Sequence, residues 1–139
     1  MVCGSIGYGG IDEIRQMYSV LHSNGYEVVD HLIQKGMDYS DIQDFRDKRE
    51  LSYKIVNHDL QCIKKVDVII VLTNGPSYGA AIEMIIAKEM TKKVILLAKN
   101  PVPSPWPINF ADYIVTSDNQ LTKLLDNLQK NMGYLSPQS

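Results

Sequence analysis

Short apolar runs rich in β-branched residues alternate with longer helical patterns along this 139-residue chain. The clearest run, Val66–Thr73, is almost continuously apolar, as expected of a strand that helices cover on both faces. Similar runs predict strands at Met1–Gly4, Tyr26–His31, Lys93–Ala98 and Asp112–Thr116, and helical periodicity predicts helices at Asp12–His22, Lys48–Lys64, Ala80–Thr91 and Asn119–Met132. This alternation is typical of βαβ units. We therefore expect an α/β fold with a doubly wound (Rossmann or flavodoxin-like) parallel five-stranded sheet and helices on both faces.

The remaining segments predict loops and helix ends. Gly36–Asp47 is polar and irregular, and Asn100–Pro107 contains four prolines, so both are expected to be loops. Gly133 is suited to end the last helix. Ligands of open α/β sheets bind beyond the carboxyl ends of the strands. The segments expected to line that crevice are Gly4–Gly10, the region after His31, and Asn74–Gly79.

The composition limits the classes of partner. Fourteen basic and sixteen acidic side chains give a net charge of −2, which does not fit a surface for polymeric nucleic acid or anionic membranes. No apolar run approaches the ~18–20 residues that span a bilayer, and the start Met1–Gly4 lacks the features of a signal peptide. Cys3 and Cys62 lack the spacing of a redox pair or a zinc site. We expect a single cytoplasmic domain over residues 1–139 that acts on a small molecule without a metal or cofactor.

A glycine-rich segment, Gly4-Ser5-Ile6-Gly7-Tyr8-Gly9-Gly10, follows the first predicted strand and precedes a helix. Glycine lets backbone N–H groups approach an anion, and the helix start adds a partial positive charge. The dinucleotide fingerprint GxGxxG is incomplete, because Asp12 occupies the third glycine position, and a Walker lysine is absent. The segment predicts either an anion-binding loop or a glycine-rich turn without a ligand.

Glu83 is the only polar residue between Ala80 and Ala87, in the helix predicted after Asn74–Gly79. A helix that is apolar on all sides is buried, and an ionised carboxylate is costly to bury without a partner. Glu83 therefore reaches solvent, pairs with a basic side chain across a subunit contact, or faces a functional cavity. Its place early in the helix favours the cavity, where the helix N-terminus would help to keep it ionised and nucleophilic.

A second carboxylate, Asp59, lies in a predicted helix on a row that also contains Leu51, Ile55 and Ile63 at intervals of four. This spacing places Asp59 on the side expected to face the core. Alone, such a residue is more typical of a solvated helix face. Together with Glu83 it forms a pair that can divide acid–base and nucleophilic roles.

Four blocks of the chain resemble the nucleoside 2-deoxyribosyltransferase superfamily, and within it most closely the 2′-deoxynucleoside 5′-phosphate N-hydrolases. The blocks are Cys3-Gly4-Ser5-Ile6 with Gly9, then Asp30-His31, then Asp59-Leu60 followed by Asp67-Val68-Ile69-Ile70, and last Ser77-Tyr78-Gly79 with Glu83. The likeness runs from residue 1 to about Leu97, with a weaker trace at Pro107-Ile108-Asn109. The order and spacing of the blocks are more specific than any single block.

The resemblance implies an N-glycosidase that cleaves 2′-deoxynucleoside 5′-monophosphates. Glu83 would attack the anomeric carbon and form a covalent glycosyl-enzyme, as in retaining glycosidases. Asp59 would orient the sugar or assist proton transfer. The substrate would be held by Gly4, Ser5, Ile6, Tyr8, Gly9, His31, Ser77 and Gly79. Asn109 would reach the site of a neighbouring subunit, since members of the family are dimers or larger assemblies.

The chain departs from the family's pattern at three places. Gly7 stands where the hydrolases usually carry an Arg that helps to bind phosphate, and Met1 stands where a Tyr usually orients the nucleophile. Tyr8 or Tyr78 could take over that second role. The ending Leu135–Ser139 lacks the C-terminal Tyr of the transferases, which favours hydrolysis. The alternatives are a nucleoside 2-deoxyribosyltransferase that exchanges bases between deoxynucleosides, and a non-catalytic nucleotide-binding module.

Overall fold

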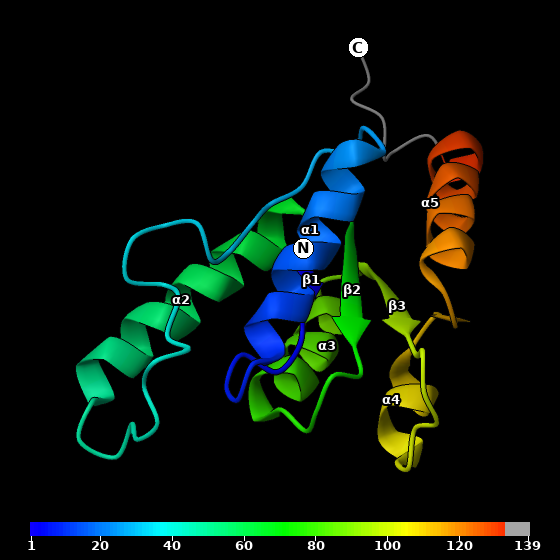
Figure 1. Cartoon of the computed structure of the whole chain (residues 1–139). Helices are drawn as coiled ribbons and strands as arrows, with labels where there is room; N and C mark the ends of the chain where they lie inside the picture. The colour runs from blue at the N-terminus through cyan, green and yellow to red at the C-terminus, as the bar shows by residue number, and fades with distance from the viewer. Residues whose placement is uncertain (133–139) are drawn as a thin grey trace.

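The computed structural model describes residues 1–132 and has a parallel β-sheet at its centre. The strands follow the order β1-β2-β3-β4, and they are β1 (Val2–Cys3), β2 (Val68–Leu72), β3 (Lys93–Leu97) and β4 (Tyr113–Val115) (Figure 1). The α/β class and the parallel sheet are thus confirmed. The predicted helix end at Gly133 and the ending Leu135–Ser139 lie outside the described residues.

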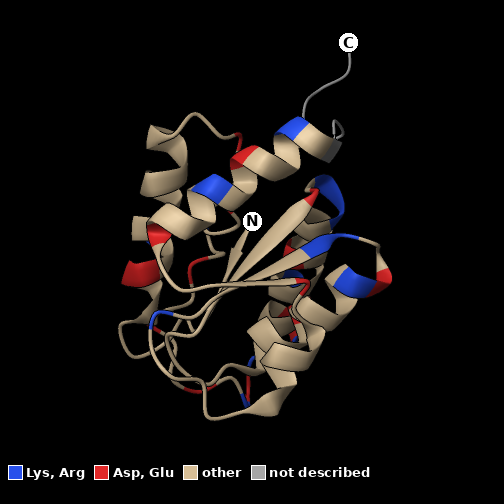
Figure 2. Cartoon of the chain, turned by 90° about the vertical axis from the view of Figure 1, so that its right-hand side faces the viewer, with Lys and Arg blue, Asp and Glu red and all other residues tan. Residues whose placement is uncertain are grey.

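Five helices connect and cover the strands within residues 1–132. They are α1 (Gly10–Ser23), α2 (Arg49–Lys65), α3 (Tyr78–Glu89), α4 (Pro105–Phe110) and α5 (Asp118–Met132). Helices α1 and α5 pack on one face of the sheet, α2 and α3 pack on the other, and α4 lies beside α3 and β3 (Figures 1 and 2). None of these helices has the length and apolar character that a membrane span requires.

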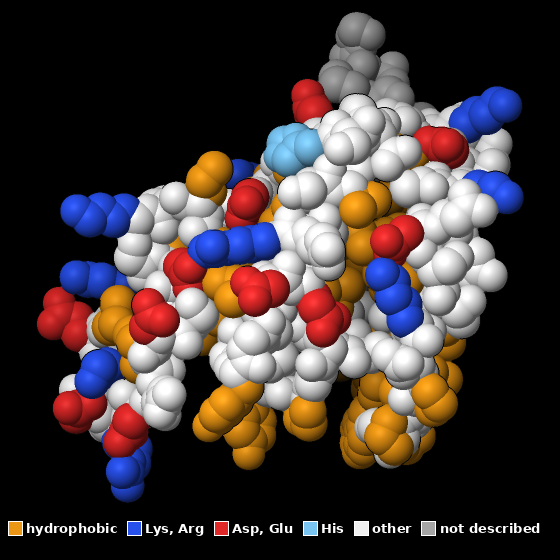
Figure 3. Space-filling view, in the orientation of Figure 1, with side chains coloured by type: hydrophobic (Ala, Val, Ile, Leu, Met, Phe, Trp, Pro, Cys, Tyr) orange, Lys and Arg blue, Asp and Glu red, His pale blue; other side chains and the backbone are white. Residues whose placement is uncertain are grey.

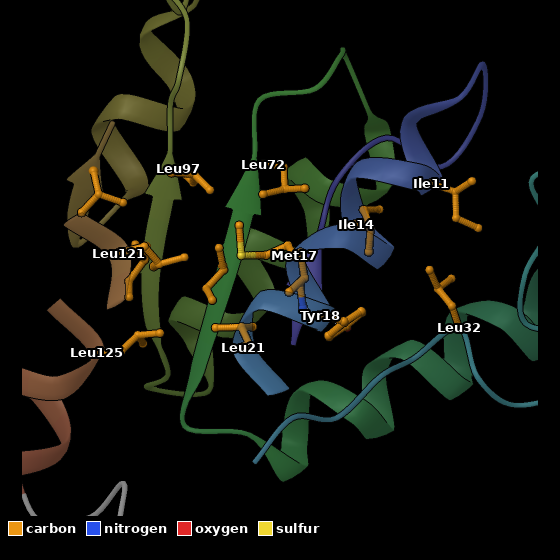
Figure 4. Packing of buried hydrophobic residues seen from close by; sticks show 14 of the residues in the cluster. Ile11, Ile14, Met17, Tyr18, Leu21, Leu32, Leu72, Leu97, Leu121 and Leu125 are labelled. Atoms are coloured by element: carbon orange, nitrogen blue, oxygen red, sulfur yellow. Dashed lines mark hydrogen bonds between the residues drawn. The ribbon is translucent and has the colours of Figure 1, made fainter. Parts of the chain in front are cut away.

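Alternate residues of each strand point to opposite faces of the sheet and build two cores. The first core contains Val2, Ile70, Leu72, Ile95 and Leu97, which pack against α1 and α5 (Figure 4). The second contains Cys3, Ile69, Val71, Val94 and Leu96, which pack against α2 and α3. Strands β2 and β3 are therefore covered on both faces, as their continuous apolar sequence predicts.

The sheet has four strands within residues 1–132, so the prediction of five is wrong, and the missing strand is Tyr26–His31. The side chain of Tyr18, in α1, lies where that strand would pair with β1. Its hydroxyl accepts a hydrogen bond from the Val2 N–H at 2.9 Å and donates one to the Val29 carbonyl oxygen at 3.0 Å. The Val2 N–H is thus bonded to a side chain instead of a neighbouring backbone, and the two-residue β1 offers few further groups for a ladder.

The predicted loop at Asn100–Pro107 ends in a short helix instead, because α4 begins at Pro105. The Ser104 Oγ caps this helix by accepting a hydrogen bond from the Trp106 N–H at 3.3 Å. Proline is compatible with the first turn of a helix, where its missing N–H would have no helical partner. A serine followed by proline therefore starts a helix here.

Candidate active site

Glu83 lies in the second turn of α3, on the side of the helix that faces the sheet. The Ser77 Oγ caps the helix by accepting a hydrogen bond from the Ala80 N–H at 3.1 Å. Ala80, Met84 and Ala87 are buried on the same side as Glu83, because helix positions three and four apart share a face. Glu83 is half-buried, and its Oε2 atom is buried with no hydrogen-bond partner among residues 1–132. The carboxyl group is therefore directed into the protein.

Asp59 lies in α2, which packs directly against α3. The predicted row is confirmed, because Ile55 and Ile63 are buried and Asp59 between them is half-buried. Burial raises the pKa of Asp59 to about 7. Burial, and after it the charge of Asp59, raises the pKa of Glu83 to about 8. The fold thus brings the two predicted carboxyl groups into one electrostatically coupled pair.

The protonation of this pair differs from the expectation that the helix N-terminus keeps Glu83 ionised. The cost of removing the carboxylate from water outweighs the helix contribution, so the pKa of Glu83 rises instead of falling. Between about pH 7 and about pH 8 the pair retains one proton. One carboxyl group is then ionised and the other protonated, which provides a nucleophile or base and an acid in the same place.

Two further side chains adjoin the pair, and no sequence pattern assigned them to the site. Cys3 is fully buried in β1, and the pKa values of its thiol and of Glu83 each respond to the other group. Tyr39, from the loop between α1 and α2, is half-buried. Burial raises the pKa of Tyr39 to about 12, with contributions from the charges of Glu83 and Asp59. Tyr39 lies in the irregular segment Gly36–Asp47, where no periodicity indicates which side chains are buried.

The two tyrosines expected to replace the family's orienting Tyr do not pack against the carboxyl pair. Tyr8 is 101% exposed and Tyr78 is 93% exposed. Tyr8 also has a φ of 53°, in a region that residues other than glycine rarely adopt. Tyr39 is instead the tyrosine whose pKa responds to both carboxylates.

Asn74 holds together the glycine-rich loop after β1 and the loop after β2. Its Oδ1 accepts a hydrogen bond from the Ser5 N–H at 2.9 Å, and its Nδ2 donates to the carbonyl oxygens of Ser5 at 3.1 Å and Gly10 at 2.9 Å. Gly10 has to be glycine, because a Cβ atom there would lie 2.1 Å from the Ser5 carbonyl oxygen. The sequence pattern did not reveal Asn74, since its partners are 69 and 64 positions away.

We predict that Asn74→Ala lowers the free energy of unfolding by about 2–3 kcal/mol, because three part-buried hydrogen bonds are lost and their backbone partners are left unsatisfied. Urea denaturation measures this change. Asn100→Ala is the matched control, because Asn100 is exposed and should change stability by less than about 0.5 kcal/mol. Equal stabilities of the two variants would show that the two loops do not depend on Asn74.

The backbone of the glycine-rich loop has N–H groups available to a ligand. The first N–H groups of α1 are already bonded, since Gly10 donates to the Gly7 carbonyl oxygen at 3.1 Å and Ile11 donates to that of Ile6 at 3.2 Å. For the N–H groups of residues 6–9, no hydrogen-bond partner occurs in the part of the chain that the structure describes. Such unpaired loop N–H groups can bind an anion without a side-chain cation.

The other predicted binding residues lie in several places. Ser5 lies beside the loop after β2, because a Cβ atom on Gly75 would be 3.6 Å from the Ser5 Oγ. Ser77 and Gly79 are at the start of α3, where Ser77 is half-buried and Gly79 is exposed. Asn109 is exposed on α4. Ser5 thus lies where the two loops meet, and Ser77 ends the loop after β2.

His31 is a buried residue bonded to the protein interior. Its side chain is 3% exposed, and its Nδ1 lies 2.8 Å from the Tyr18 hydroxyl. Burial lowers the pKa of His31 to about 4, so the ring is neutral near pH 7. The His31 carbonyl oxygen lies 3.1 Å from the His58 Nε2. The contacts of His31 therefore join α1, α2 and the segment between them.

The carboxyl pair does not line either of the two cavities found at the sheet ends. One cavity, of about 450 Å³, lies between α1, the start of α5 and the carboxyl ends of β2 and β3. The other, of about 720 Å³, lies near the amino ends of β1 and β2. Glu83 and Asp59 belong to the opposite face of the sheet from the first cavity. Within residues 1–132, no three His, Cys, Asp or Glu side chains are grouped so that they could hold a metal ion.

Comparisons with known proteins do not assign the chain to a family. No protein-family model matches it, and no curated protein sequence matches it.

Proposed function

We propose that the protein is an N-glycosidase that cleaves the bond between the base and the sugar of 2′-deoxynucleoside 5′-monophosphates. The observation that carries this proposal is the coupled pair of Glu83 and Asp59, with pKa values of about 8 and about 7. Such a pair supplies both a carboxylate nucleophile and a carboxylic acid near neutral pH. The resemblance to the 2′-deoxynucleoside 5′-phosphate N-hydrolases supplies the substrate class.

In the proposed first step, the ionised Glu83 attacks C1′ and the bond from C1′ to the base nitrogen breaks. The electron pair of that bond leaves with the base, which takes a proton from Asp59. In the second step Asp59, now ionised, accepts a proton from water, and the resulting hydroxide displaces Glu83 from C1′. Asp59 has the lower pKa of the two, so the proton has to move from Glu83 to Asp59 before reaction, at a cost on the order of 1 kcal/mol. That cost is small beside a glycosidic barrier.

The two bordering loops support a site for the 5′-phosphate. The N–H groups of residues 6–9 have no partner among residues 1–132. Ser5 directly precedes these residues and its hydroxyl lies beside Gly75, and the Ser77 hydroxyl is at the start of α3. Backbone N–H groups and hydroxyls can bind a phosphate where Gly7 replaces the usual Arg. The proposal therefore assigns the phosphate to the loop backbone.

We predict a bell-shaped dependence of kcat/KM on pH with a maximum between about pH 7 and about pH 8, because only the singly protonated pair has both reactive forms. Initial rates of base release across about pH 5.5–9.5 measure it. In Asp59→Asn the limb that requires Asp59 should disappear, and kcat/KM should fall about a hundredfold. A rate that depends on a single ionisation near pH 4.5, the ordinary Glu pKa, would show that the pair is not coupled.

The experiment that tests the function is a chromatographic assay of the purified protein with a panel of deoxynucleosides, deoxynucleoside monophosphates and ribonucleotides. The proposal expects free base and deoxyribose 5-phosphate from the monophosphates. Addition of a second free base distinguishes a transferase from a hydrolase, because only the transferase would form a new deoxynucleoside. Binding without turnover of any substrate would favour a non-catalytic nucleotide-binding module and contradict the enzyme.

We also propose that the chain assembles with a second copy of itself. Figure 3 shows hydrophobic side chains gathered at the edge of the molecule formed by α3 and α4. Large hydrophobic side chains of these helices are exposed, namely Tyr78, Ile82, Trp106 and Ile108. Exposed apolar patches of this kind support association of like subunits, and a partner would bring Asn109 near a second site.

A further inference from the structure

Cys3 occupies the position in the sheet directly beneath the nucleophile proposed above. It is the second residue of β1, its side chain is 0% exposed, and it belongs to the core between the sheet and helices α2 and α3. Ala80 and Met84 belong to the same core, and they stand on either side of Glu83 on the inner face of α3. Strand β1 also packs directly against α3. The Cys3 side chain therefore lies on the face of the sheet that α3 covers, the same face toward which Glu83 is directed.

Cys3 offers a hydrogen-bond donor, and Glu83 has an acceptor without a partner. The Cys3 thiol is buried in the core that α3 covers, and the Glu83 Oε2 is buried without a hydrogen-bond partner among residues 1–132. Burial and the charge of Glu83 raise the pKa of Cys3 well above its usual range, so the thiol keeps its proton. A thiol that stays protonated is a hydrogen-bond donor and not a nucleophile.

The groups that shift the pKa of Glu83 come from α2 and from the start of the chain. Asp59 of α2 raises its pKa by charge repulsion, whereas the Cys3 thiol and the amino group of Met1 lower it. The charge of Glu83 in turn acts on Tyr39 and Cys62.

We propose that Cys3 is a positioning residue, whose Sγ–H donates a hydrogen bond to the Glu83 carboxylate and fixes that group for attack. The thiol would thereby do what an orienting tyrosine does in the proteins that the chain resembles, where this chain has Met1. This inference rests on the proposed function for its role in catalysis, but the hydrogen bond itself is independent of any activity.

Infrared spectroscopy of the S–H stretch tests the hydrogen bond directly. In Cys62→Ala, which removes the other thiol, the remaining band belongs to Cys3. We expect that band to move to lower frequency as pH rises through about 8, the pKa of Glu83, because an ionised acceptor makes a stronger hydrogen bond. In Cys62→Ala/Glu83→Gln the band should stay in place. A band that does not move with pH in the Glu83 protein would overturn the proposal.

Kinetics tests the positioning role in the active enzyme. Cys3→Ala should lower kcat/KM about tenfold and move the alkaline limb of its pH profile upward by about half a pH unit, because loss of the donor raises the pKa of Glu83. Cys3→Ser keeps a donor and should restore both values to within about twofold of the parent. Equal limbs in Cys3→Ala and the parent would contradict the role. If Cys3→Ala does not fold, the infrared test on the Cys62→Ala protein decides the matter, and if no substrate is turned over, only the proposed function fails.

Discussion

Replacing Glu83 by Gln should reduce the rate of base release from deoxynucleoside monophosphates at least a thousandfold. The amide lacks the negative charge that attacks C1′, so the covalent step is lost. Chromatographic rates at saturating substrate measure the effect. Glu89→Gln is the matched control, because Glu89 is an exposed carboxylate in the last turn of the same helix, and its loss should leave the rate within about twofold.

A loss of less than about tenfold in Glu83→Gln would contradict the assignment of the nucleophile. Unfolding does not explain a loss of activity in this variant, since the same substitution is expected to stabilise the protein. The activity and the stability of one protein sample therefore have to change in opposite directions.

Glu83→Gln should raise the free energy of unfolding above about pH 7, by on the order of 2 kcal/mol at pH 8. In the folded protein the pKa of Glu83 is raised from 4.5 to about 8. The folded state therefore binds more protons than the unfolded state over this range, so its stability falls as pH rises from about 4.5 to about 8. Ionisation of a fully buried group with this pKa would lower the free energy of unfolding by about twice as much. The expected effect is half of that because Glu83 is half-buried.

Urea denaturation of the parent protein and Glu83→Gln at pH 5 and at pH 8 checks this prediction. The stability difference between the two proteins should grow with pH, because Gln carries no proton to lose. Glu89→Gln is the control at an exposed position of the same helix, and it should change stability by less than about 0.5 kcal/mol. Parallel pH dependences of the parent and Glu83→Gln would show that Glu83 is not held in a desolvating environment.

Local patterns in the sequence predicted the elements that bury apolar residues. β2 and β3 follow from continuous β-branched runs, and the row of Ile55, Asp59 and Ile63 correctly predicted the inner face of α2. The strand predicted at Tyr26–His31 has the same local character, but Tyr18 bonds to the edge of β1 where it would pair. A local sequence pattern cannot show that the Tyr18 side chain takes the place of a strand at the edge of β1.

Individual residues of the candidate site could be recognised from the sequence only where their chemistry does not fit the neighbouring residues. Glu83 was recognised because a carboxylate in an apolar helix requires an explanation. Asn74 lies in a segment expected to line the crevice and Tyr39 in a predicted loop, but both fit their polar loops, so nothing in the sequence indicated their individual roles. Their roles depend on groups that the fold brings close from distant positions, such as Gly10 for Asn74 and Glu83 for Tyr39.

The central claim is that Glu83 carries the sugar during the reaction. The most direct measurement uses a deoxynucleoside monophosphate analogue with fluorine at C2′, which slows release of the sugar from the enzyme, followed by mass spectrometry of the acid-quenched protein. We predict a sugar phosphate attached to the peptide that contains Glu83, and no adduct in Glu83→Gln. Base release by the parent protein with no adduct on Glu83, or with an adduct on another residue, would contradict it.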